Sequence, residues 1–128
     1  MMIKTIAAGL ILSALALAPV AALAATAAPA KLATTSMGKA WVNARGMALY
    51  TFEKDTATQS NCNGPCAVEW PPLLAKRGAK PSGEWTLVAR ADGHEMWAYD
   101  GHPLYSFVDD KKPGQVTGDG EDGFHLAK

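Results

Sequence analysis

The sequence predicts a small, mainly β domain of antiparallel strands, built from two related hairpin units (meander- or sandwich-like) with one short helix between them. Three observations predict it: a duplicated aromatic segment, closely spaced Asp-Gly steps, and the position of all ten aromatic residues beyond residue 40. Short strands joined by tight turns have these features. About 100 residues beyond a leader are enough for one such domain.

The first 24 residues have the pattern of a secretory signal peptide. A short basic start precedes an apolar stretch, and Ala22-Leu23-Ala24 matches the small-x-small cleavage signal. The stretch is Ala-rich and Pro19 interrupts it, so a membrane anchor is the less favoured interpretation. We expect residues 25–38 to be a flexible lead-in, and residues 39–128 to form a single β-rich domain.

An internal repeat with an offset of about 55 residues carries many of the aromatic side chains. The matching residues of the two copies are Tyr50, Phe52 and Asp55, and Tyr105, Phe107 and Asp110. Period-2 alternation puts both aromatic residues of a copy on one strand face, so we expect them to fill the interior of half-buried strands. We expect each aspartate to accept backbone N–H groups and fix a turn. A ligand-binding role for the carboxylates is the alternative.

Turn signals predict the order of the strands. Asp92-Gly93 and Asp100-Gly101 supply the positive φ of tight turns and indicate a three-strand meander. An earlier hairpin is expected around Arg45-Gly46, and a last strand after a long glycine-rich loop over 109–123, a length typical of functional loops. The expected strands cover residues 41–44, 47–52, 86–90, 94–99, 103–108 and 124–127.

The segment between the hairpins predicts one or two turns of helix over residues 65–70. Pro65 suits the first helical position, and Pro71 prevents continuation beyond Trp70. Cys62 and Cys66, the only two cysteines, are expected to form a disulfide in an oxidising compartment. The alternative is a redox-active or copper-binding pair, because a helix N-terminus favours a thiolate.

Three stretches together resemble a known family. They are the two Tyr-x4-Asp copies, Cys-Asn-Gly-x-Cys-Ala-x-x-Trp-Pro-Pro-Leu over 62–73, and Asp-Gly-x-x-x-Trp-x-Tyr-Asp-Gly-x-Pro-Leu-Tyr over 92–105. They are similar to the secreted-repeat proteins described as predicted lipoproteins with a Tyr-x-(Phe/Trp/Tyr)-x-x-Asp motif. The resemblance covers about residues 40–126 and implies no activity, because the family has none assigned. Many relatives carry a lipid-attachment cysteine that this sequence lacks, so we expect no stable membrane anchor after signal cleavage.

His94, Met96 and His102 are the candidate metal ligands. His94 and Met96 are two residues apart on one strand, and a tight turn can bring His102 alongside them. Imidazole and thioether ligands favour copper(I) or haem iron. A surface or turn role for each histidine is the alternative, and no cofactor is predicted.

Charge and motifs leave three hypotheses for the function. The 12 basic and 12 acidic residues give no basic surplus, so nucleic acid is not an expected partner. No serine lies in a Gly-x-Ser-x-Gly motif. We expect a periplasmic or secreted, non-enzymatic binding module for an unknown envelope protein or small ligand, with any exposed aromatic side chains at its binding face. The alternatives are a copper- or haem-binding envelope protein and a thiol–disulfide oxidoreductase working through Cys66.

Overall fold

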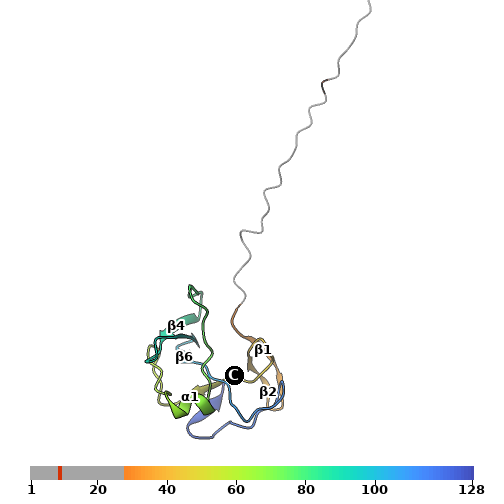
Figure 1. Ribbon diagram of the computed structural model, residues 1–128. Helices are drawn as coiled ribbons and strands as arrows, with labels where there is room; N and C mark the ends of the chain where they lie inside the picture. The colour runs from red at the N-terminus through yellow and green to blue at the C-terminus, as the bar shows by residue number, and fades with distance from the viewer. Residues whose placement is uncertain (1–8, 10–27) are drawn as a thin grey trace, which may run out of the picture.

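Short antiparallel strands make up most of the regular structure in the computed structural model, which describes residue 9 and residues 28–128 (Figure 1). The elements in chain order are β1 (Lys31–Thr35), β2 (Gly38–Val42), β3 (Tyr50–Phe52), α1 (Pro65–Glu69), β4 (Trp85–Ala89), β5 (Glu95–Tyr99), β6 (His102–Pro103) and β7 (Phe124–Leu126). No helix in this described part is long and apolar enough to cross a membrane. The predicted signal peptide, apart from residue 9, lies outside the described residues.

The strands form three small antiparallel sheets. β1 pairs with β2, β3 pairs with β7, and β4, β5 and β6 form a meander. Figure 1 shows the β1–β2 hairpin at one side of the domain and the β4–β6 meander at the other, with the C-terminus between them. The predicted mainly β fold with two related units and one short helix is therefore confirmed.

β1 corrects the predicted extent of the flexible lead-in. We expected residues 25–38 to be flexible, but Lys31–Thr35 pairs with β2 along its whole length. The prediction rested on the small apolar area that this Ala/Thr-rich segment can bury. In the structure, backbone hydrogen bonds to β2 order the segment instead. The Thr35 hydroxyl also closes the turn by donating to the carbonyl of Gly38 (2.6 Å). Residues 25–27 lie outside the described part of the chain.

Tyr50 and Tyr105 lie at the centre of an approximate twofold relation between the two repeats. The N–H of Tyr50 donates to the carbonyl of Tyr105 (2.7 Å), and the N–H of Tyr105 donates back to the carbonyl of Tyr50 (2.9 Å). The surrounding bonds recur in both halves: Leu49 donates to the carbonyl of Trp41, and Leu104 donates to the carbonyl of Trp97. The two copies of the repeat therefore pair with each other.

This pairing explains why two predicted strands are shorter than expected. Of the strand predicted over 103–108, only Pro103 lies in a strand (β6), and Tyr105 forms isolated bridges. Of the strand predicted over 47–52, only β3 remains, with one bridge between Val42 and Ala48. After Leu49 and Leu104 the chain leaves its own hairpin and pairs across to the other repeat. The sequence pattern of a single repeat predicts only its own hairpin and cannot predict this pairing with the other repeat. The helix and the last strand each end one residue earlier than predicted.

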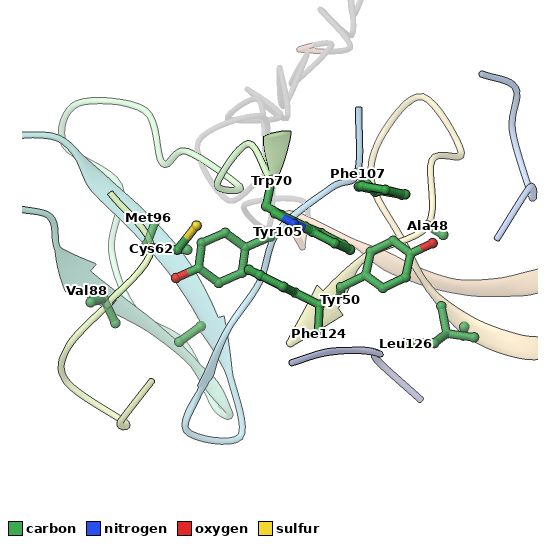
Figure 2. Packing of buried hydrophobic residues seen from close by; sticks show 12 residues of the cluster. Ala48, Tyr50, Cys62, Trp70, Val88, Met96, Tyr105, Phe107, Phe124 and Leu126 are labelled. Carbon is green, nitrogen blue, oxygen red and sulfur yellow. The ribbon is translucent and has the colours of Figure 1, made fainter. Parts of the chain in front are cut away.

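The main hydrophobic core lies on the tyrosine face of the repeats. Figure 2 shows Tyr50 and Tyr105 on either side of stacked rings, with their hydroxyls pointing in opposite directions. The Trp70 and Phe124 rings stack with centroids 3.9 Å apart, and Phe107 stacks on the other side of Trp70 at 4.0 Å. Both tyrosines are fully buried and Phe107 is 7% exposed, so these three motif aromatics fill the interior as predicted. Phe52 is only partly buried and packs against this core.

The opposite face of the repeats is buried at its leucines, which corrects the prediction of half-buried strands in part, because Thr51 and Ser106 on that face are partly exposed. Leu49 and Leu104 are fully buried in a second cluster with Ala30 and Ala127. Ala30, which directly precedes β1, belonged to the segment predicted to be flexible. Because that segment is ordered, it covers the leucine face of the repeats, which the alternation pattern predicted to be exposed to solvent.

Candidate functional site

The tyrosines and aspartates of the motif form two hydrogen-bonded pairs, and each pair joins the two repeats. The hydroxyl of Tyr50 donates to Asp110 Oδ2 (2.7 Å), and the hydroxyl of Tyr105 donates to Asp55 Oδ2 (2.5 Å). Burial, followed by the bond to the carboxylate, raises the pKa of both phenols well above their ordinary value. Both phenols therefore remain protonated donors at neutral pH.

The second oxygen of each carboxylate fixes a turn. Asp55 Oδ1 accepts the N–H of Asn61 (2.7 Å), and Asp110 Oδ1 accepts the N–H of Thr117 (2.9 Å). Burial raises the pKa of the Asp55 carboxyl, and the bonds from Tyr105 and Asn61 offset this only in part. Both aspartates are thus occupied by protein donors, which favours a structural role over a ligand-binding one.

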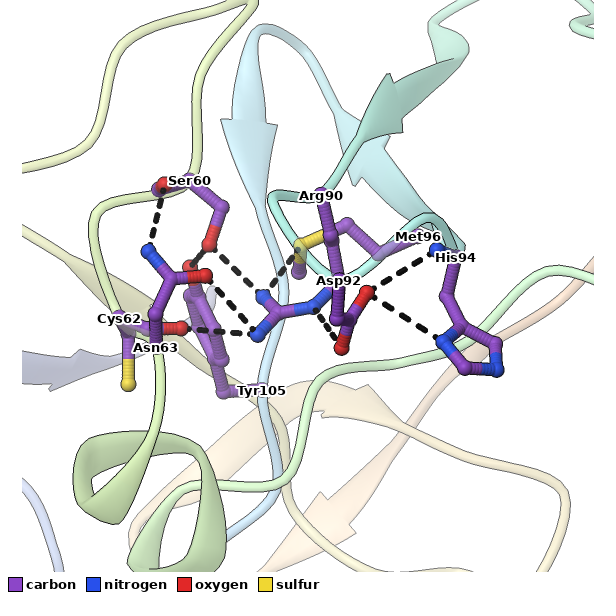
Figure 3. A network of polar contacts seen from close by, with 8 residues as sticks. All are labelled: Ser60, Cys62, Asn63, Arg90, Asp92, His94, Met96 and Tyr105. Carbon is purple, nitrogen blue, oxygen red and sulfur yellow. Dashed lines mark hydrogen bonds and ion pairs between the residues drawn. The ribbon is translucent and has the colours of Figure 1, made fainter.

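Arg90 is a buried cation that links the β4–β5 hairpin to the cysteine loop (Figure 3). Its side chain is 1% exposed. Nη1 donates to Ser60 Oγ and Nη2 donates to the carbonyl of Cys62, both at 2.9 Å. Ser60 Oγ also lies 2.5 Å from the Tyr105 hydroxyl, so the network reaches the Tyr105–Asp55 pair. Because protein acceptors use these donors, Arg90 stabilises the fold.

The sequence reasoning did not single out Arg90 or Ser60. One signal was present: alternation along the predicted strand puts Arg90 on the same face as Val88, which is buried. An arginine on a core-facing position needs acceptors, and the cysteine loop supplies them. No pattern around Ser60 indicated its contact with a tyrosine 45 residues further along the chain.

Cys62 and Cys66 form the predicted disulfide. Their Cα atoms are 5.2 Å apart, within the range that a disulfide needs. Cys62 is fully buried, and Cys66, the second residue of α1, is partly buried. Arg90 binds the carbonyl of Cys62, so the disulfide and the guanidinium hold the same loop. This arrangement favours a structural staple over a redox-active or copper-binding pair.

The proposed metal ligands do not lie together, which corrects the prediction of a shared site. Met96 is fully buried, with its sulfur 3.6 Å from Nη1 of Arg90. His94 is exposed in the turn before β5, with Nδ1 3.3 Å from Asp92, and His102 is exposed opposite Tyr99 at the other end of that strand. The predicted strand included His94, but β5 begins one residue later, so strand alternation does not govern the histidine. Among the described residues, no three His, Cys, Asp or Glu side chains are placed to hold a metal ion.

One backbone arrangement builds two surface grooves, one in each half of the domain. The N–H of Trp41 donates to the carbonyl of Ala127 (2.9 Å), and the N–H of Trp97 donates to the carbonyl of Leu73 (2.8 Å). Trp41 of the first repeat therefore lies beside Ala127, which follows β7 of the second repeat. Trp97 of the second repeat lies beside Leu73, which follows α1 of the first repeat. The grooves open next to these two tryptophans.

The groove beside Trp41, here called the aromatic groove, has a volume of about 260 Å³. Its lining includes Trp41, Tyr99, Asp100, His102, Leu126 and Ala127. Trp85 packs against Trp41 with ring centroids 5.4 Å apart and against Tyr99 at 4.9 Å. All three aromatic side chains remain partly exposed. They form a cluster of accessible aromatics of the kind expected at a binding face.

The groove beside Trp97, here called the cationic groove, is larger, with a volume of about 640 Å³. Its lining includes Arg45, Leu73, Leu74, Lys76, Arg77 and Trp97. It combines mostly apolar side chains with three cationic ones, and no acidic residue of the described part of the chain lines it.

Comparison with known families assigns the chain. A family model described as a secreted repeat of unknown function matches it twice, over residues 31–74 and 86–125. The two matches cover more than half of the chain, so the protein belongs to this family of secreted repeats. Each match contains one Tyr-x4-Asp copy and one groove tryptophan, and the first begins at the first residue of β1. No curated protein and no solved structure matches the chain.

Proposed function

We propose that the protein is a non-enzymatic binding module of the periplasm or the secreted fraction, with its ligand at the aromatic groove. The observation that carries this is the cluster of Trp41, Trp85 and Tyr99, whose rings pack together yet stay accessible. Clustered, partly exposed aromatic side chains beside a concavity are typical of binding sites. The family description as a secreted repeat supports secretion, and the disulfide supports an oxidising compartment.

The groove favours a small ligand with a flat ring, such as a sugar unit of an envelope glycan. Trp41 and Tyr99 supply apolar ring surfaces for stacking. Asp100 and His102 supply hydrogen-bonding groups at the same groove, as sugar hydroxyls require. A volume of about 260 Å³ lies just below the range of drug-sized sites, which suits a single ring or part of a short chain.

Titration of ¹⁵N-labelled protein with disaccharide fragments of peptidoglycan tests this proposal. Each tryptophan has its own indole N–H signal, so the signals of Trp41 and Trp85 should move, while that of Trp70, 1% exposed, should stay. Tyr99→Ala should weaken binding about tenfold, the usual effect of removing a central aromatic contact. The control is Val68→Ala, which shortens an exposed apolar side chain on α1 and should leave binding unchanged.

Two results would overturn the proposal. One is no movement of the Trp41 and Trp85 signals, either with glycan fragments or with a solubilised envelope extract. The other is binding that is unchanged in the Tyr99→Ala variant.

A further inference from the structure

The duplication allows the two grooves to be compared position by position. Trp97 takes the place of Trp41, and Leu73 takes the place of Ala127, with the same backbone hydrogen bond between them. A second bond also recurs, because Ala127 and Leu73 each donate an N–H to the leucine that precedes a motif tyrosine. The backbone frame is therefore shared, and differences in binding chemistry come from the side chains around it.

The side chains at the turns differ most in charge. The turn after β5 places Asp100 at the aromatic groove, whereas the corresponding turn after β2 places Ala44 and Arg45 at the cationic groove. The segment that follows Leu74 adds Lys76 and Arg77 to the cationic groove. One frame thus carries one acidic and one basic side chain, Asp100 and Lys128, in one copy, and three basic side chains in the other.

The three cations of the cationic groove have no acidic partner. Within residues 28–128, none of the ion pairs involves Arg45, Lys76 or Arg77. Residues 1–27 contain no aspartate or glutamate that could supply one. Three cations that converge on one groove without a carboxylate attract an anion.

Apart from Asn43, the other side chains that line the groove are apolar. Trp97 and Leu73 contribute to its lining, and Leu74 is 51% exposed, one of the few large apolar side chains that are open to solvent within residues 28–128. Covering this surface would remove apolar area from water. The volume of about 640 Å³ lies within the range of sites for single small molecules.

We propose that the cationic groove binds a small organic anion with an apolar body, in the class of medium-chain carboxylates. The carboxylate lies among Arg45, Lys76 and Arg77, and the chain lies over Leu74 toward Trp97. The apolar body distinguishes this ligand from an inorganic anion, and the three cations distinguish it from a neutral lipid. The two grooves share no lining residue, although Trp85 packs against both Trp41 and Trp97. The test of this site follows Trp97 and the substitutions below, so it does not depend on the function proposed for the aromatic groove.

Titration with decanoate, kept below its micelle concentration, tests the proposal directly. Decanoate should bind and move the indole N–H signal of Trp97. Decyltrimethylammonium, which has the same chain and the opposite charge, should bind at least about tenfold more weakly, because like charges repel at the rim. Binding of decanoate should also weaken as salt is added.

Substitutions separate the two parts of the site. Arg45→Gln with Arg77→Gln should weaken decanoate binding about tenfold, at roughly two- to fivefold for each exposed cation. Leu74→Ala should weaken it about threefold by removing apolar contact. The matched control, Lys39→Gln with Lys54→Gln, makes the same change in net charge at exposed positions outside the groove and should have no effect.

Three outcomes would overturn the proposal. They are no decanoate binding, equal binding of the ammonium compound, and decanoate binding that survives the Arg45 and Arg77 substitutions. Vesicles of phosphatidylglycerol give a separate arm of the experiment. Binding to these vesicles without binding of free decanoate would assign the cations to a membrane surface instead, and would also overturn the proposal.

Discussion

The phenol of Tyr50 donates a hydrogen bond to the carboxylate of Asp110, 60 residues further along the chain and in the other repeat (2.7 Å). Tyr105 makes the reciprocal bond to Asp55. Neither tyrosine uses the aspartate of its own Tyr-x4-Asp copy in this way. Each copy of the motif therefore supplies the tyrosine of one hydrogen-bonded pair and the aspartate of the other, so both copies are needed to form either pair. This explains why the two repeats form one domain with a shared core.

A double-mutant cycle tests the crossed pairing. Tyr50→Phe and Asp110→Ala should show a coupling energy of about 1–2 kcal/mol, because a buried hydrogen bond to a charged acceptor joins the two side chains. The measurement is the free energy of unfolding by urea for the wild type, both single variants and the double variant. The control cycle, Tyr50→Phe with Asp55→Ala within one repeat, should give less than about 0.5 kcal/mol. A larger coupling within the repeat than across the repeats would contradict the structure.

The carboxyl of Asp55 should titrate above its ordinary pKa of 3.8, because burial raises the pKa more than its hydrogen bonds lower it. Folding then favours the protonated form. The contribution of Asp55 to the free energy of unfolding is therefore full below pH 3.8 and falls as pH rises through its folded pKa. Carbon NMR of the carboxyl gives the pKa directly.

Two variants check the causes of this shift. Tyr105→Phe removes a bond that lowers the pKa, so it should raise the pKa of Asp55 further. Asp55→Asn removes the titrating group. The free energy of unfolding of this variant, measured between about pH 3 and pH 6, should therefore lack the decrease with rising pH that Asp55 causes in the wild type. A folded pKa at or below 3.8 would show that the hydrogen bonds outweigh burial.

Replacing Arg90 should cost much more stability than replacing an exposed arginine. Arg90→Met leaves Ser60 and the carbonyl of Cys62 without their buried donor, so we expect a loss of about 2–4 kcal/mol in urea unfolding. Arg90→Lys should recover only part of this loss, because a single ammonium cannot reproduce the planar fork that reaches both acceptors. Arg77→Met, at an exposed position, should stay within about 0.5 kcal/mol of the wild type. Equal effects at the two positions would contradict the network.

The local parts of the fold could be predicted from the sequence. Asp92-Gly93 and Asp100-Gly101 predicted the turns that flank β5, and Pro65 and Pro71 predicted the limits of α1 to within one or two residues. Each of these signals acts within a few residues of the feature that it fixes, through backbone conformation or a missing N–H. The disulfide was predictable for the same reason, since only two cysteines are present and they lie four residues apart.

The parts that depend on contacts between the repeats could not be predicted in this way. Alternation placed Tyr50 in the core, but it could not show that the partner of its hydroxyl is Asp110. The same limit applies to the grooves, because Trp41 meets Ala127 and Trp97 meets Leu73 only after the halves have paired. The one sequence feature that indicated contacts between the repeats is the duplication itself. Repeats that each have one exposed apolar face are expected to pack together.

Removing the disulfide tests whether it is a local staple. Cys62→Ala with Cys66→Ala should leave the domain folded and cost roughly 2 kcal/mol in urea unfolding, the entropy expected for so small a loop. Because Arg90 also binds the carbonyl of Cys62, the two devices hold the same loop and should not act independently. In the variant that also carries Arg90→Met, the total loss should be smaller than the two separate losses together by about 0.5–1 kcal/mol, since a loop already released has less to lose. Strictly additive losses would mean that the disulfide and the guanidinium stabilise different parts of the fold.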